Sequence, residues 1–121
     1  MTRKAVGWLA VVAMVSASSV AFAHMALSKS MPAANAVVST RPATIQIWFT
    51  QAPDKAVSRL TLIGPSGEVK LGALTAAADK SIAAPVEGGT PDGAYKVAWQ
   101  AAGDDGHVQK GEFAFSVRQS R

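Results

Sequence analysis

The sequence contains no cysteine, and this absence excludes several kinds of site. Without thiols the chain cannot form disulfides, thiolate zinc sites, iron–sulfur clusters or a cysteine nucleophile. Histidine is nearly as scarce, because His24 and His107 are the only two in 121 residues. Any metal site must therefore use nitrogen, oxygen or thioether ligands, and these two histidines are the first candidates.

Positive charge is too sparse and too scattered to indicate a nucleic-acid-binding protein. The formal net charge is +4, and removal of Arg3 and Lys4 with the N-terminal segment described below would leave about +2. The other lysines and arginines occur without a basic stripe or an interleaved aromatic surface, which nucleic-acid binding requires. We expect no nucleic-acid partner. Hydrolysis has no support either. The order of the histidines, serines and acids along the chain does not identify a nucleophile, a base and an orienting group.

Residues 1–23 have the pattern of a secretory signal peptide. A basic start and an apolar run precede "SASSVAFA", which ends in the small-x-small pattern that signal peptidase accepts. A membrane anchor is the alternative, but the apolar run is shorter than the roughly 20 residues needed to cross a bilayer. We expect cleavage after Ala23, export, and a single mature domain of residues 24–121.

Short alternating segments in the mature chain predict an all-β sandwich of about seven strands. These segments are separated by Pro/Gly turns such as "GPSG" and "TPDG", and "EVKLG" returns from the first of these turns as a hairpin. The alanine-rich "LTAAADKSIAAP" is short and ends in Pro85, which argues against a helix. Tyr95, after "PDG", predicts a tyrosine corner with a buried hydroxyl. The side chains expected to point inward are Ile45, Ile47, Phe49, Tyr95, Val97, Trp99, Phe113, Phe115 and Val117.

The two histidines can belong to one copper site. After cleavage His24 has a free α-amine, and this nitrogen and Nδ1 can close a six-membered chelate ring on one metal ion. Planar nitrogen donors suit Cu(II). Asp105 and His107 project to one side of an extended chain, and Gly106 between them permits a close bend. Because the first and last strands of a sandwich often lie near each other, the two halves can meet.

The alternative is that neither histidine has a function. The tripeptide "DGH" is commonly a turn before a strand, and a histidine after a cleavage site is often incidental. What favours a site is that the only two histidines lie at the two places where one copper ion could be bound.

Two long segments resemble the CopC family of periplasmic copper-binding proteins. They are "HMALSKSMPAANAVVSTRPATIQIWFT" and "GAYKVAWQAAGDDGHVQKGEFAFSV", which together contain the family's mature His, its "Y-x-V-x-W" strand, "D-G-H" and "G-x-F-x-F-x-V" in order. The resemblance implies a seven-stranded, immunoglobulin-like Greek-key sandwich or barrel. It also implies one Cu(II) held by the His24 amine and imidazole, Asp105 and His107, and an inner-membrane copper transporter of the CopD type as partner.

The chain departs from the family pattern at three points. Many relatives begin "H-A-H", whereas this chain has His24-Met25-Ala26 and lacks the third histidine. Gln51 stands where relatives often have an acid, which removes a possible axial carboxylate. The mature chain has only Met25 and Met31 in place of a methionine-rich loop, and we expect Met31 to pack before Pro32 and the site to bind Cu(II) alone.

The sequence therefore predicts a monomeric, non-enzymatic periplasmic protein of copper homeostasis and resistance, which buffers copper or delivers it to a membrane partner. One alternative is an oxidative enzyme, since a histidine-plus-amine copper brace is also the catalytic unit of lytic polysaccharide monooxygenases. Against it, no flat aromatic substrate surface is evident, and Asp105 as a fourth ligand leaves less room for oxygen. The other alternative is a metal-free immunoglobulin-like interaction module, which would tolerate an altered first residue.

Overall fold

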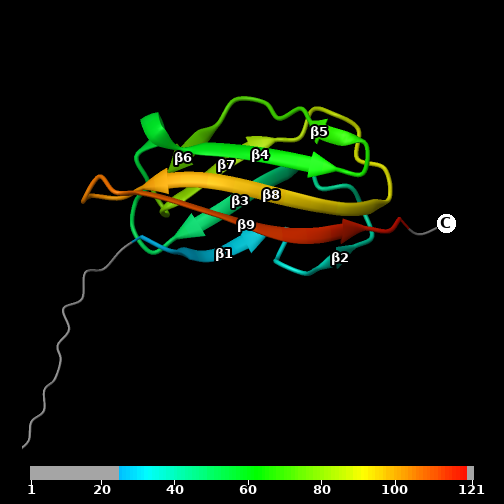
Figure 1. The fold of residues 1–121 in the computed structure, drawn as a ribbon, viewed down its shortest axis with the longest axis horizontal. Coiled ribbons are helices and arrows are strands. Elements are labelled where there is room, and N and C mark those ends of the chain that lie inside the picture. The colour runs from blue at the N-terminus through cyan, green and yellow to red at the C-terminus, as the bar shows by residue number, and fades with distance from the viewer. Residues whose placement is uncertain (1–24, 120–121) are drawn as a thin grey trace, which may run out of the picture.

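Two β-sheets packed face to face make up residues 25–119, the part of the chain that the computed structural model describes (Figure 1). The first sheet has the order β1-β3-β7-β6, with β1 Leu27–Met31, β3 Thr44–Phe49, β7 Ser81–Pro85 and β6 Thr75–Ala77. The second has the order β2-β9-β8-β4-β5, with β2 Val37–Val38, β9 Val108–Val117, β8 Gly93–Ala102, β4 Arg59–Gly64 and β5 Gly67–Val69. A short 3-10 helix, η1 (Lys55–Val57), precedes β4.

The core lies between the sheets and follows the alternation expected from the sequence. Ile45, Ile47 and Phe49 of β3 are buried, as period-two strands with one covered face require. Val97 of β8 is buried opposite them, and half-buried Trp99 packs against the same core. The other buried core side chains are Met25, Leu62, Val69, Ile82, Tyr95, Ala101, Phe115 and Val117. The prediction of an all-β sandwich is confirmed.

The described residues form nine strands, two more than the sequence predicted. The sequence patterns located β3, β4, β5, β8 and β9, and the other four strands contain two to five residues each. The two-residue β2 runs parallel to the end of β9, and the three-residue β6 forms a hairpin with β7 in the alanine-rich segment. Strands this short contain too few residues to show alternation, so the pattern could not reveal them.

Strands that neighbour each other in space are often distant in sequence. β4 pairs with β8, and β3 pairs with β7, both antiparallel. Connections of this kind are typical of Greek-key sandwiches. The hairpin predicted after "VSRLTLIG" is present as β4 and β5, with Gly64 opposite Gly67. Among residues 25–119 we find no helix long and apolar enough to span a bilayer.

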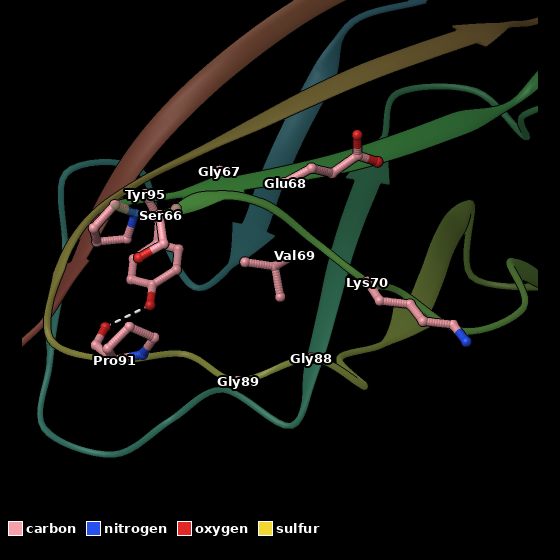
Figure 2. Close-up of a pocket in the computed structure, with 11 residues that line it drawn as sticks. Ser66, Gly67, Glu68, Val69, Lys70, Gly88, Gly89, Pro91 and Tyr95 are labelled. Carbon is pink, nitrogen blue, oxygen red and sulfur yellow. Dashed lines mark hydrogen bonds between the residues drawn. The ribbon is translucent and has the colours of Figure 1, made fainter.

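Tyr95 forms the predicted tyrosine corner. Its ring is buried and stacks on Phe115 with the ring centroids 5.3 Å apart. Its hydroxyl donates a hydrogen bond to the carbonyl oxygen of Pro91, four residues upstream, as Figure 2 shows. Burial raises the pKa of the Tyr95 hydroxyl, because the phenolate would lose solvation inside the protein. The hydrogen bond between Tyr95 and Pro91 therefore links the turn before β8 to the core.

Replacement of Tyr95 with phenylalanine should destabilise the protein by about 1–2 kcal/mol at pH 7, because the Pro91 carbonyl loses its donor. Since the folded-state pKa lies above the unfolded value of about 10, the stability that depends on the neutral hydroxyl is complete below pH 10 and is lost as pH rises through the folded pKa. Denaturant unfolding of both proteins from pH 7 to 11 measures this difference. Equal alkaline destabilisation of the wild type and Tyr95→Phe would contradict the assignment.

Candidate metal centre

The loop between β8 and β9 contains both Asp105 and His107. Ala102 pairs with Val108 as the last rung of the hairpin, so residues 103–107 project beyond the sheet. The backbone N–H of Gly106 donates to the carbonyl oxygen of Gly103 at 3.1 Å and closes a turn. Gly106 has φ +75°, a left-handed conformation that glycine adopts without steric cost. This bend brings the residues on either side of Gly106 together.

Asp105 and His107 contact each other through two pairs of atoms. The backbone N–H of His107 donates to Asp105 Oδ1 at 3.0 Å, and His107 Nδ1 lies 3.2 Å from Asp105 Oδ2. The His107 side chain is 71% exposed and the Asp105 side chain 38% exposed. The predicted juxtaposition of these two side chains is thus present at an accessible loop.

This contact has a chemical consequence for the imidazole. When Nδ1 carries the proton and donates it to Asp105, Nε2 keeps its lone pair and can bind a metal ion. An ionised carboxylate has about four lone-pair sites, so Asp105 can accept these bonds and still offer an oxygen. The pair therefore provides one nitrogen and one oxygen donor of the kind that Cu(II) accepts.

The other half of the predicted site begins beside the first strand. His24, like the predicted signal peptide, lies outside the described residues, so its own position is not part of this geometry. Met25 is buried in the core. The backbone N–H of Ala26 donates to Thr50 Oγ1 at 3.0 Å, and the backbone N–H of Thr50 donates to the carbonyl oxygen of Ala26 at 2.9 Å. The chain is therefore fixed two residues after His24.

The β8–β9 loop and the residues that follow His24 lie at one end of the sandwich. Figure 1 shows the β8–β9 loop and the beginning of β1 at the same end, with the end of β9 at the other. Thr50 bonds Ala26, and the next residue, Gln51, accepts a hydrogen bond from the backbone N–H of Asp104 at 3.4 Å. Within residues 25–119 no three His, Asp or Glu side chains come together as a metal cluster, so the described part of the candidate site is the Asp105–His107 pair.

The sequence did not single out Thr50, and it singled out Gln51 only as a residue that lacks a carboxylate. Gln51 was noted for the carboxylate that it lacks, yet its side-chain carbonyl contacts the loop that contains Asp105. The signal available in the sequence was position: both residues directly follow a strand with a strong alternating pattern, and polar residues at strand ends commonly form site edges.

Another carboxylate at this end of the sandwich binds side chains outside the candidate site. Asp79, in the turn between β6 and β7, accepts hydrogen bonds from Ser81 Oγ at 2.5 Å and from Trp48 Nε1 at 3.0 Å. These two bonds lower the pKa of Asp79, because they stabilise its ionised form. The ammonium of Lys29 lies 4.6 Å from the centre of the Trp48 ring. This group of side chains ties β1, β3 and the β6–β7 turn together.

The two methionines that follow the predicted cleavage site differ in their exposure to solvent. Met25 is 4% exposed and belongs to the core, whereas Met31, at the opposite end of β1, is 58% exposed. The expectation that Met31 packs was wrong, because its position at the end of a strand leaves the side chain uncovered. The thioethers of Met25 and Met31 do not form a pair.

Two surface hollows lie away from the Asp105–His107 pair. The one drawn in Figure 2, with a volume of about 150 Å³, lies between the β4–β5 turn and the segment that contains Pro91. A groove of about 390 Å³ runs beside Met31 and Arg41. Neither includes a residue of the β8–β9 loop. The candidate centre is therefore an exposed loop site, suited to an ion that enters directly from solvent.

Sequence comparison finds copper-resistance proteins. The sequence model of the CopC domain matches residues 27–118. Copper resistance protein C of Xanthomonas campestris pv. juglandis is 34% identical over 110 residues, which cover 84% of this chain and 86% of that protein. Protein YobA of Escherichia coli K12 is 32% identical over 101 residues, which cover 80% of this chain and 81% of that protein.

Solved structures agree with the sequence matches. PcoC from Escherichia coli, described as a methionine-rich copper resistance protein, superposes with a TM-score of 0.70 and 29% identity, covering 79% of this chain and all of that one (100%). CopC from Methylosinus trichosporium OB3b superposes with a TM-score of 0.73 and 22% identity, covering 81% of this chain and 97% of that one. The second similarity supports the fold alone.

Proposed function

The chain belongs to the CopC family, and from this premise we propose that it is a periplasmic Cu(II)-binding protein of copper homeostasis and resistance. The observation that carries the proposal is the Asp105–His107 pair, held in an exposed loop at the end of the sandwich where the chain enters β1. Copper resistance protein C, among the relatives, supports copper as the ion.

The proposed ligands are the α-amine and imidazole of His24, the imidazole of His107 and the carboxylate of Asp105. Ala26 is fixed to Thr50, and two extended residues span at most about 7 Å, so His24 begins within reach of this end of the sandwich. Three nitrogens and one oxygen satisfy the tetragonal preference of Cu(II). The free amine requires cleavage after Ala23, which we propose together with export to the periplasm.

The proposed role is to buffer Cu(II) or to deliver it to an inner-membrane transporter of the CopD type. An exposed ligand pair suits transfer, because a partner can approach the ion without opening the protein. We further propose that the protein acts as a monomer and is not an enzyme. A fourth protein ligand from Asp105 occupies a position that oxygen would need in oxidative chemistry.

Titration with Cu(II) of protein confirmed by mass spectrometry to begin at His24 tests the proposal. We expect tight binding of one ion per chain, with a nitrogen-rich tetragonal EPR spectrum. Binding should also quench tryptophan fluorescence, because two tryptophans lie beside Phe49, the residue before Thr50. Trp48 is its neighbour in the sequence, and the ring centroid of Trp99 lies 5.3 Å from that of Phe49. Absence of tight binding would reject the copper function and favour a metal-free interaction module.

A further inference from the structure

Two adjacent residues directly after β3 contact the two segments that adjoin the proposed copper ligands. Thr50 accepts a hydrogen bond from the Ala26 backbone through Oγ1 and donates one to Ala26 through its own N–H. Gln51 accepts one from the Asp104 backbone through Oε1. Ala26 lies two residues after His24, and Asp104 directly precedes Asp105. The loop and the N-terminal segment are otherwise separated by most of the sequence.

We propose that Thr50 and Gln51 are positioning residues, which set the distance between the N-terminal ligands and the β8–β9 loop before copper binds. This inference rests on the proposed Cu(II) function and adds residues that do not themselves touch the ion. The proposed site divides its ligands between two segments, with an amine and an imidazole on one and a carboxylate and an imidazole on the other. These ligands bind one ion well only if the two segments are held in register. Neighbouring residues that directly follow one strand supply that register.

Gly103 gives independent support for the contact between Gln51 and the loop. A methyl group built at Gly103 would overlap Oε1 of Gln51, so the amide lies directly against the glycine backbone. Any side chain at position 103 would displace Gln51 from the loop. The chain therefore has a residue without a side chain at the place where Gln51 approaches the backbone of the loop.

The amide of Gln51 is suited to this task in a way that a carboxylate is not. It accepts the N–H of Asp104 without adding negative charge beside Asp104 and Asp105, where like charges would repel. A neutral side chain also does not compete for the ion as an anionic ligand. Gln51 therefore orients the loop and leaves coordination to His24, Asp105 and His107.

Site-specific amide exchange in the metal-free protein tests the contacts directly. Thr50→Val should accelerate exchange of the Ala26 amide and leave Asp104 unchanged, whereas Gln51→Leu and Gly103→Ala should accelerate exchange of Asp104 alone. Thr50→Ser keeps the hydroxyl and should restore the protection of Ala26. Thr75→Val and Gln119→Leu are matched controls, because Thr75 is exposed on β6 and Gln119 follows the far end of β9. Unchanged exchange at both amides would overturn the proposal.

Copper titration of the same variants tests the consequence. Thr50→Val and Gln51→Leu should each weaken Cu(II) binding about 3- to 10-fold, the effect expected for one neutral hydrogen bond. Thr50→Ser and both controls should bind as the wild type does, and Gly103→Ala combined with Gln51→Leu should be no weaker than either alone. If the wild type binds Cu(II) and the variants bind it equally well, the positioning role is wrong. If the wild type itself does not bind Cu(II), the copper function fails instead.

Discussion

One additional residue before His24 should lower the affinity for Cu(II) by at least about 100-fold. The extra residue converts the His24 amine into an amide, whose nitrogen binds Cu(II) only after it loses its proton, and so removes the neutral amine ligand and the chelate ring that this amine forms with Nδ1. Loss of an outer partner of a metal ligand already weakens binding 10- to 100-fold, so loss of a ligand should cost more. Residues 25–119 keep all their contacts, because Ala26 remains bonded to Thr50.

The comparison requires proteins whose first residue is verified by mass spectrometry. Competition titration against a Cu(II) chelator measures the affinities of the protein beginning at His24 and of the extended form. The matched control has one extra residue after Arg121, and β9 ends at the opposite end of the sandwich (Figure 1). We expect the control to bind as the unextended protein does. Equal affinity with and without the N-terminal extension would mean that the amine is not a ligand.

Much of the fold follows from local patterns in the sequence. β3 and β8 are long enough for alternation to identify both the strand and its buried face, and Ile45, Ile47, Tyr95 and Val97 are all buried. The tyrosine corner follows from Tyr95 after a Pro/Gly turn. β6 could not be predicted, because its three exposed residues show no alternation and its pairing with β7 depends on the rest of the sheet.

The candidate site was predictable in part for a different reason. Asp105, Gly106 and His107 are adjacent in sequence, so their contact depends mainly on the left-handed glycine between the other two. The approach of the N-terminal segment to this loop is a property of the whole sandwich. It depends on Thr50 and Gln51 at the end of β3, and nothing in the local sequence identifies what these side chains contact.

Replacement of His107 with alanine should weaken Cu(II) binding by more than about 100-fold, and Asp105→Asn should weaken it by only about 10-fold. Alanine removes a nitrogen ligand, which EPR should report as loss of one nitrogen coupling. Asparagine keeps an oxygen that can accept the His107 backbone N–H and so preserves the turn, but it loses the negative charge and the acceptor for Nδ1. The order of the two effects therefore separates the role of the imidazole from that of the carboxylate.

Asp104→Asn is the matched control for this pair, because Asp104 is an exposed carboxylate in the same loop. It removes the same charge one residue away, and the affinity should change by no more than about 2- to 3-fold, since Asp104 is not a proposed ligand and an exposed charge acts on the ion through high-dielectric solvent. Melting temperatures should stay close to that of the wild type, because the His107 side chain is 71% exposed and supports no core packing. Equal affinity of His107→Ala and the wild type would remove His107 from the site. Equal losses in Asp104→Asn and Asp105→Asn would mean that the loop contributes only negative charge, with no specific carboxylate ligand.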